Sequence, residues 1–132
     1  MIDQATEDLL VDRAKENFMK GKVSLMYPTT GAALLGKSGK IYDGASLTFK
    51  PYTNSPATHV YAETAALAQG LICENEFDAI AFYQTFPPES FKPDSQTIGE
   101  LALLDKNKTC EVIIQSTDGE RKRVQLSDYT NN

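Results

Sequence analysis

The sequence has few of the features that mark membrane, nucleic-acid-binding or cysteine-ligated metal proteins. No run of eighteen apolar residues occurs, so no segment is expected to span a membrane. The 13 basic residues are outnumbered by 18 acidic ones, which gives a net charge of −5. Because binding to phosphate backbones requires clustered Lys and Arg, we expect no nucleic-acid polymer as a partner. The two cysteines, Cys73 and Cys110, do not form a Cys-x-x-Cys pair, which excludes a cysteine-based zinc site.

The remaining bulk features describe an ordinary globular protein. Both cysteines have apolar neighbours, and each is expected to be a buried, reduced thiol. Residues 1–8 open with acids and lack the basic-then-apolar layout of a secretory signal, so a cytoplasmic location is expected. The sequence contains no repeat, linker or low-complexity segment. A chain of this length builds one core, and we therefore expect a single domain over residues 1–132.

Local patterns predict alternating helices and strands. An amphipathic helix is expected to begin near Thr6 and to stop at Gly21. Apolar runs on either side of Ser38-Gly39 predict a hairpin, and residues 47–58 have the composition of a loop. The further expected elements are a helix capped by Thr58 that ends at Gly70, a strand at 79–85, a proline-rich loop at 86–93, a helix beginning at Asp94 or Ser95, and strands at 112–114 and 121–126 joined by Asp118-Gly119. Arg121, Lys122 and Arg123 are expected to lie on a solvated strand face. This order predicts the α/β class, with a layered sandwich on a mixed sheet.

Five segments, taken in order, resemble the cytidine deaminase family. They are residues 27–35, 37–44, 60–67, 78–82 and 93–97, and the similarity extends from Tyr27 to about Tyr129. The resemblance implies a three-layer α/β/α sandwich with a mixed sheet. It also implies a homo-oligomer, either a dimer or a tetramer, because members of that family commonly assemble in this way.

The segments that would hold the chemistry keep the family's spacing but not its ligands. Nucleobase deaminases bind zinc through a His or Cys two residues before a catalytic Glu and through a downstream Pro-Cys-x-x-Cys. The three ligand positions read Tyr61, Asp94 and Thr97, whereas the acid is retained as Glu63. A tyrosine hydroxyl titrates near 10 and a threonine hydroxyl is neutral, so neither suits zinc at neutral pH. We therefore expect no zinc cofactor and no metal site. The Arg that follows the Glu in the family is Thr64.

Sugar recognition also departs from the family's pattern. The Asn-x-Glu pair that holds ribose is expected just after Gly44, where the sequence reads Ser46-Leu47-Thr48. The residues expected to contact a ligand are Tyr61, Asp94, Thr97, His59, Tyr27, Ser46 and Thr48, and Glu63 is the candidate catalytic acid. The former zinc site is expected to be a concave space bounded by Tyr61, Glu63, Asp94 and Thr97, with residues 47–58 at its mouth.

Several of these residues also have a purely structural interpretation. Glu63 is also a favourable acid in the first turn of a helix. His59 either faces the pocket as an acid or base near neutral pH or is a surface or capping residue. Tyr52, Tyr61 and Phe86 are candidates for stacking on a planar ligand, whereas Phe82 and Tyr83 are expected to pack in the core.

Three functions are compatible with these observations. The first is a non-catalytic module that binds a nucleoside, a nucleotide or another small ligand. The second is a metal-independent enzyme that pairs Glu63 with His59 or Asp94. The third is a structural subunit of a homo- or hetero-oligomer.

Overall fold

A computed structural model describes residues 1–21, 29–49 and 58–130. The elements in chain order are α1 (Gln4–Lys20), β1 (Thr30–Gly36), β2 (Ile41–Ala45), β3 (Leu47–Phe49), β4 (Thr58–Val60), α2 (Ala62–Cys73), β5 (Phe77–Gln84), α3 (Ser95–Leu104), β6 (Glu111–Ser116), β7 (Arg121–Gln125) and a 3₁₀ turn, η1 (Leu126–Tyr129). The order matches the predicted one, with a short β3–β4 pair added.

The main sheet is mixed and has the strand order β2-β1-β5-β6-β7. The β5–β6 pair is parallel, and the other neighbouring strands of this sheet are antiparallel. The α3 helix connects the two parallel strands, as such a crossover requires. The hairpins joining β1 to β2 and β6 to β7 turn at Gly39 and Gly119, whose φ angles of 93° and 98° favour glycine.

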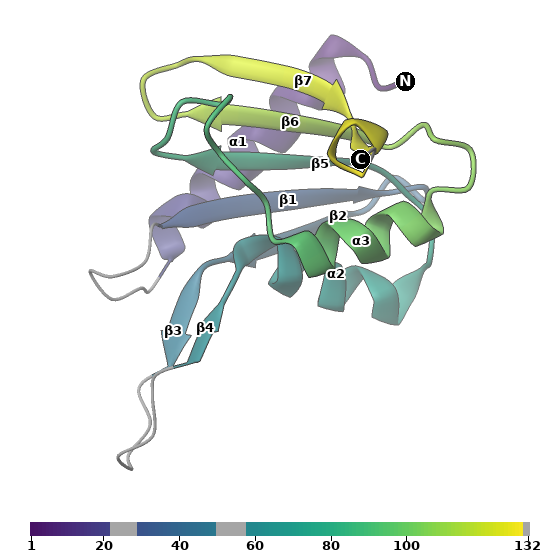
Figure 1. Cartoon of the computed structure of the whole chain (residues 1–132), viewed down its shortest axis with the longest axis horizontal. Coiled ribbons are helices and arrows are strands. Elements are labelled where there is room, and N and C mark those ends of the chain that lie inside the picture. Colours follow the sequence, from purple (N-terminus) through teal and green to yellow (C-terminus); the bar gives the residue numbers. More distant parts are fainter. Residues whose placement is uncertain (22–28, 50–57, 131–132) are drawn as a thin grey trace.

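Helices cover both faces of this sheet (Figure 1). The α1 helix packs Leu10, Val11 and Ala14 into a core with Ala33 and Ala81 of the sheet. On the other face, α2 and α3 share a second core with β1, β5 and β6, in which Phe82 is fully buried. The fold is therefore an α/β sandwich, as the sequence predicts. Phe82 and Tyr83 both belong to the core, which confirms that expectation.

The boundaries of α1 and α2 differ from the predicted ones. Asp3 rather than Thr6 caps α1, because its carboxylate accepts a hydrogen bond from the Thr6 amide. The expected cap at Thr58 is wrong, since this residue pairs in β4 with Phe49 of β3. The α2 helix also continues past Gly70 to Cys73. A side-chain carbon at Gly70 would lie 2.7 Å from the Phe77 ring, so this glycine permits a close contact rather than ending the helix.

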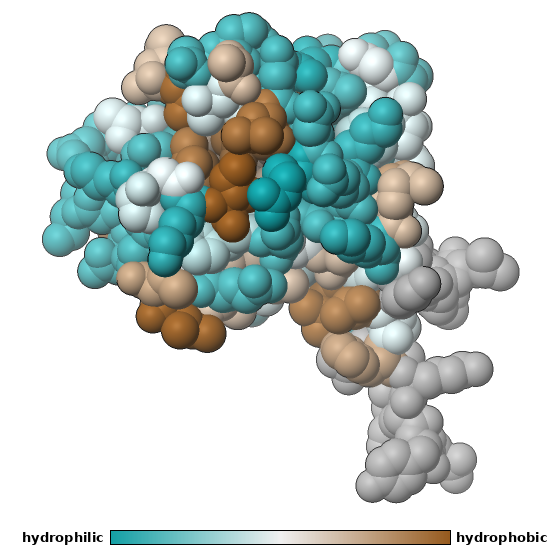
Figure 2. Space-filling view, turned by 180° about the vertical axis from the view of Figure 1, so that it is seen from behind, coloured by the Kyte–Doolittle hydropathy of each residue, from teal (hydrophilic) through white to brown (hydrophobic). Residues whose placement is uncertain are grey.

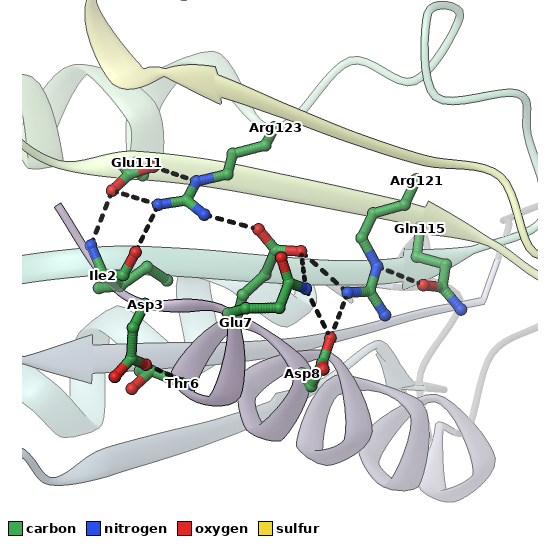
Figure 3. A network of polar contacts seen from close by, with 10 residues as sticks. Ile2, Asp3, Thr6, Glu7, Asp8, Glu111, Gln115, Arg121 and Arg123 are labelled. Atoms are coloured by element: carbon green, nitrogen blue, oxygen red, sulfur yellow. Dashed lines mark hydrogen bonds and ion pairs between the residues drawn. The ribbon is translucent and has the colours of Figure 1, made fainter.

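Two expectations about side chains are confirmed only in part. Cys110 is buried as predicted, but Cys73 is exposed at the end of α2. Arg121 and Arg123 of β7 are not simply solvated, because each ion-pairs with Glu7 of α1 at 2.9 Å (Figure 3). Arg123 also pairs with the buried Glu111 carboxylate. This network joins the start of α1 to the β6–β7 edge of the sheet.

The surface on the α1 side is mostly hydrophilic, and its apolar atoms form separate patches rather than one continuous area (Figure 2). Leu9 and Met19 are exposed apolar residues of α1. Within the described ranges, no helix combines the length and the apolar character needed to cross a membrane.

Candidate functional site

A pocket of about 140 Å³ lies where α2 begins and where β5 leaves the sheet toward α3. Residues from the start of β1, from the segment between β2 and β3, from β4, from the start of α2 and from the β5–α3 connection surround it. They are Thr30, Ser46, His59, Tyr61, Glu63, Phe86, Ser90, Phe91 and Lys92. The crevice beside the carboxyl end of a strand is a common position for ligand sites in α/β folds.

Glu63 is the buried acid of this pocket. It lies in the first turn of α2, and only 2% of its surface is exposed. Its Oε2 accepts a hydrogen bond from the Asp94 amide at 2.8 Å. Burial raises the pKa of this carboxyl group because the charged form loses its hydration. Glu63 is therefore more than a surface acid stabilised by the helix dipole.

The position of α2, and with it that of Glu63, depends on a close contact with β2. A side-chain carbon at Gly44 would lie 2.0 Å from the Ala62 carbonyl oxygen and 2.8 Å from the Ala66 amide nitrogen. Ala62 and Ala66 are fully buried. The alanine-rich face of α2 thus packs directly on the sheet, as its composition predicts.

His59 lines the same pocket from β4, where it is partly buried. Its Nδ1 lies 3.1 Å from Thr48 Oγ1, and its ring meets Tyr61 edge-on with 4.8 Å between the ring centroids. Burial lowers the pKa of this imidazole, which favours the neutral ring. Of the two positions considered from sequence, the structure gives His59 the one that faces the pocket.

Asp94 and Thr97 do not line this pocket, which corrects the expected four-residue boundary. Asp94 caps α3, and its Oδ2 accepts hydrogen bonds from the Thr97 amide at 3.1 Å and from Thr97 Oγ1 at 2.8 Å. Thr97 Oγ1 also lies 2.8 Å from Thr64 Oγ1 across the α2–α3 contact. Both side chains border a shallow groove between α2 and α3 instead.

Tyr61 lines the pocket beside Glu63 and is 46% exposed, so its side chain is not buried in the core. In the described part of the chain, no three His, Cys, Asp or Glu side chains are grouped closely enough to hold a metal ion.

Ser46 and Thr48, which are expected to contact a sugar, form hydrogen bonds within the protein. Ser46 is 1% exposed, and its hydroxyl donates to the Thr30 carbonyl at 3.0 Å and accepts from the Thr30 amide at 3.1 Å. Thr48 is bonded to His59. Tyr27 and Tyr52 lie outside the described residues.

Sequence reasoning missed the wall formed by Ser90, Phe91 and Lys92, together with Thr30. The segment from Phe86 to Pro93 was predicted as a loop because of its three prolines, and it follows the carboxyl end of β5. That position is itself a signal for ligand contact.

Comparison with known proteins finds matches among solved structures alone. No protein-family model and no curated protein matches the sequence. A cytidine deaminase from Burkholderia pseudomallei superposes with a TM-score of 0.76 at 25% identity, covering 92% of this chain and 94% of that one. The fold is that of a cytidine deaminase.

More distant structures show the same cytidine deaminase fold. The enzyme from Mycobacterium tuberculosis has a TM-score of 0.65 at 18% identity and covers 97% of this chain and 94% of that one. The Mycobacterium leprae enzyme has a TM-score of 0.65 at 12% identity, with 95% of this chain and 97% of that one covered. The structural similarity thus extends over nearly the full length of this chain.

Proposed function

We propose that this protein binds a planar, single-ring heterocycle, such as the base of a pyrimidine nucleoside or nucleotide, and that it does not deaminate its ligand through zinc. The observation that carries the proposal is a pocket that keeps the buried acid Glu63 while the neighbouring Asp94 and Thr97 bond to each other.

The size and lining of the pocket support a small ring as the ligand. An engineered cavity of about 150 Å³ holds benzene, and this pocket measures about 140 Å³. Phe86, Phe91 and Tyr61 supply aromatic surface, and Glu63 and His59 supply polar groups. Such a combination of apolar walls and a few convergent polar groups is typical of small-molecule sites.

The residues at the family's ligand positions do not fit a zinc ion. Catalytic zinc is held by three His, Cys, Asp or Glu side chains. Among Tyr61, Asp94 and Thr97 there is one such side chain, and its Oδ2 already accepts two hydrogen bonds from Thr97. The neutral Thr64–Thr97 pair occupies the place where the family has a cation beside thiolates. These contacts support a site that has lost metal chemistry.

Titration of cytosine, cytidine and uridine, followed by protein NMR or calorimetry, tests the binding proposal. Binding of at least one of them in the micromolar to low-millimolar range is expected. The Tyr61→Ala variant should weaken binding about threefold or more with little change in thermal stability, because this side chain is 46% exposed. Ile72→Ala, at an 85% exposed position of the same helix, is the control and should bind normally. If neither these compounds nor orotate and cytidine 5′-monophosphate bind, the proposal fails.

A second candidate is metal-independent acid–base catalysis, and one observation favours it. Glu63 and His59 line one pocket, and burial raises the pKa of the carboxyl group while it lowers the pKa of the imidazole. Each shift favours the neutral form of its group, so a protonated carboxyl group that can donate a proton and a neutral imidazole that can accept one line the same pocket. Turnover of a bound pyrimidine that persists with a chelator and is lost in both Glu63→Gln and His59→Gln would support this function.

A further inference from the structure

We infer that the ligand of this pocket carries a carboxylate or phosphate group, which Lys92 binds at the open side of the pocket. This inference rests on the binding function proposed above and specifies the ligand class. It predicts an anionic single-ring compound in place of a neutral nucleoside.

The two charged side chains of the pocket lie at different depths. Glu63 is 2% exposed and therefore forms part of the floor, whereas Lys92 is exposed and belongs to the rim. An anionic substituent beside Glu63 would be repelled whenever that carboxyl group is charged. A ligand with an anionic end is therefore favoured in one orientation, with its ring inward and its charge beside Lys92.

Lys92 is available for such a contact. In the described part of the chain, four other basic side chains, Arg13, Lys37, Arg121 and Arg123, form ion pairs. No described acid lies within ion-pairing distance of Lys92, although the protein carries a net charge of −5. An ammonium group at the rim of a pocket in an acidic protein supplies local attraction for an anion.

Recognition of a neutral sugar has less support from the lining. The Ser46 hydroxyl both donates to and accepts from the Thr30 backbone, and it is 1% exposed. Thr48, the other residue at the family's ribose-contacting positions, is bonded to His59. Both hydroxyls already form hydrogen bonds within the protein, which disfavours their use as sugar ligands. The substituent on the ring must therefore be held by other polar groups, among which Lys92 carries a positive charge.

The gain in affinity that Lys92 provides is expected to be modest, because this side chain is exposed to solvent. A solvent-exposed ammonium paired with an anion contributes modestly, so we expect a three- to tenfold gain in affinity. The gain should decrease as salt is raised from about 0.02 to 0.5 M, because screening shortens the range of the interaction.

Two ring-matched pairs of compounds test the inference: orotate against uracil, and cytidine 5′-monophosphate against cytidine. Dissociation constants are measured by calorimetry on the wild type, on Lys92→Met and on Lys106→Met. The control removes the same charge at an exposed position outside the pocket lining. The wild type and the control should bind an anionic member three- to tenfold more tightly than its neutral match, and Lys92→Met should abolish that preference. The pair that shows the preference distinguishes a ring carboxylate from a phosphate on the sugar.

The outcomes separate this inference from the function on which it rests. If the neutral compounds bind as tightly as the anionic ones and Lys92→Met changes nothing, the inference is overturned while the binding function stands. A preference that Lys92→Met leaves intact also overturns it. If none of the four compounds binds to the wild type, the binding function fails, and the inference fails with it.

Discussion

The carboxylate of Glu63 accepts a hydrogen bond from the backbone amide of Asp94 at 2.8 Å, so the buried acid of α2 also positions the start of α3. Asp94 in turn caps α3 through the Thr97 amide. The candidate site and the α2–α3 contact therefore share one chain of hydrogen bonds. A change in the charge of Glu63 acts on both.

The purified protein should contain far less than one zinc per chain. Tyr61 and Thr97 offer hydroxyl groups, which are poor zinc ligands, and the Asp94 carboxylate already accepts a hydrogen bond from Thr97. Elemental analysis measures this directly. The triple variant Tyr61→Cys, Asp94→Cys and Thr97→Cys should gain zinc, at a cost of about 1 kcal/mol for the lost helix cap. Stoichiometric zinc in the wild type that survives mild chelation would contradict the prediction.

Cytidine, deoxycytidine and cytosine should not be deaminated above background. Without a metal the attacking water keeps a pKa near 15.7, and a single carboxyl group does not replace zinc. A coupled ammonia assay provides the measurement. Turnover that disappears in Glu63→Gln would show that the buried acid still catalyses the reaction.

The variant Glu63→Gln should become more stable relative to the wild type as the pH rises. Its amide oxygen still accepts from Asp94, but the side chain does not ionise. Burial raises the pKa of Glu63 above its ordinary value of 4.5. The stabilising contribution of the protonated acid is therefore complete below pH 4.5 and is lost as pH rises through the raised pKa. Urea unfolding of both proteins between pH 4.5 and 8 measures the difference, and a difference that stays constant contradicts the prediction.

Replacement of Glu111 by Gln should destabilise the fold by about 2 kcal/mol at pH 7, because it removes charged hydrogen bonds to Arg123 and the Ile2 amide. Burial alone would raise the pKa of Glu111, but these bonds outweigh it and lower the pKa below 4.5. The contribution is present above pH 4.5 and is lost as pH falls through the lowered pKa.

The exposed Lys37–Glu76 pair is the matched control for Glu111. Its side chains are 62% and 55% exposed, so Glu76→Gln should change the free energy of unfolding by less than about 0.5 kcal/mol. Equal losses in Glu111→Gln and Glu76→Gln would mean that burial of Glu111 contributes nothing.

Two glycine-to-alanine variants should have opposite effects. Gly44→Ala forces a carbon to within 2.0 Å of the Ala62 carbonyl oxygen, so α2 must move, and a loss of at least about 2 kcal/mol is expected. Gly99→Ala, in α3, meets nothing within 4 Å and should gain up to about 1 kcal/mol from helix propensity. Thermal unfolding compares them. A harmless Gly44→Ala would show that α2 is not fixed on β2 by this contact.

The order of elements was predictable because apolar runs, turn dipeptides and caps are local signals. Ser38-Gly39 and Asp118-Gly119 mark the two hairpins, and Asp94 marks the start of α3. The β3–β4 pair was not predictable, since its short strands are joined through residues with a loop composition. Gly70 does not end α2, although a glycine after a helical pattern predicts a helix end. Its role is to permit the close contact with the Phe77 ring of β5, and a tertiary contact of this kind leaves no local signal in the sequence.

The candidate site was predictable only in part. Spacing identified Tyr61, Glu63 and His59, all of which line the pocket. It also placed Asp94 and Thr97 there, because a motif in sequence does not reveal that their side chains bond to each other. Lys92 belongs to no motif, and its position at the pocket depends on the path of the β5–α3 connection. The expected homo-oligomer stays a prediction.

The ion pairs between α1 and β7 have a consequence for how the chain acquires its structure. Arg121 bonds to Glu7 across a separation of 114 residues, and Arg123 bonds to it across 116. During synthesis, Glu7 can therefore form these ion pairs only after more than a hundred further residues have been added to the chain. Contacts of such long range form slowly, so closure of this edge is expected to be a late step of folding. The apolar contacts of α1 with Ala33 and Ala81 span shorter separations in sequence, so they are expected to form before these ion pairs.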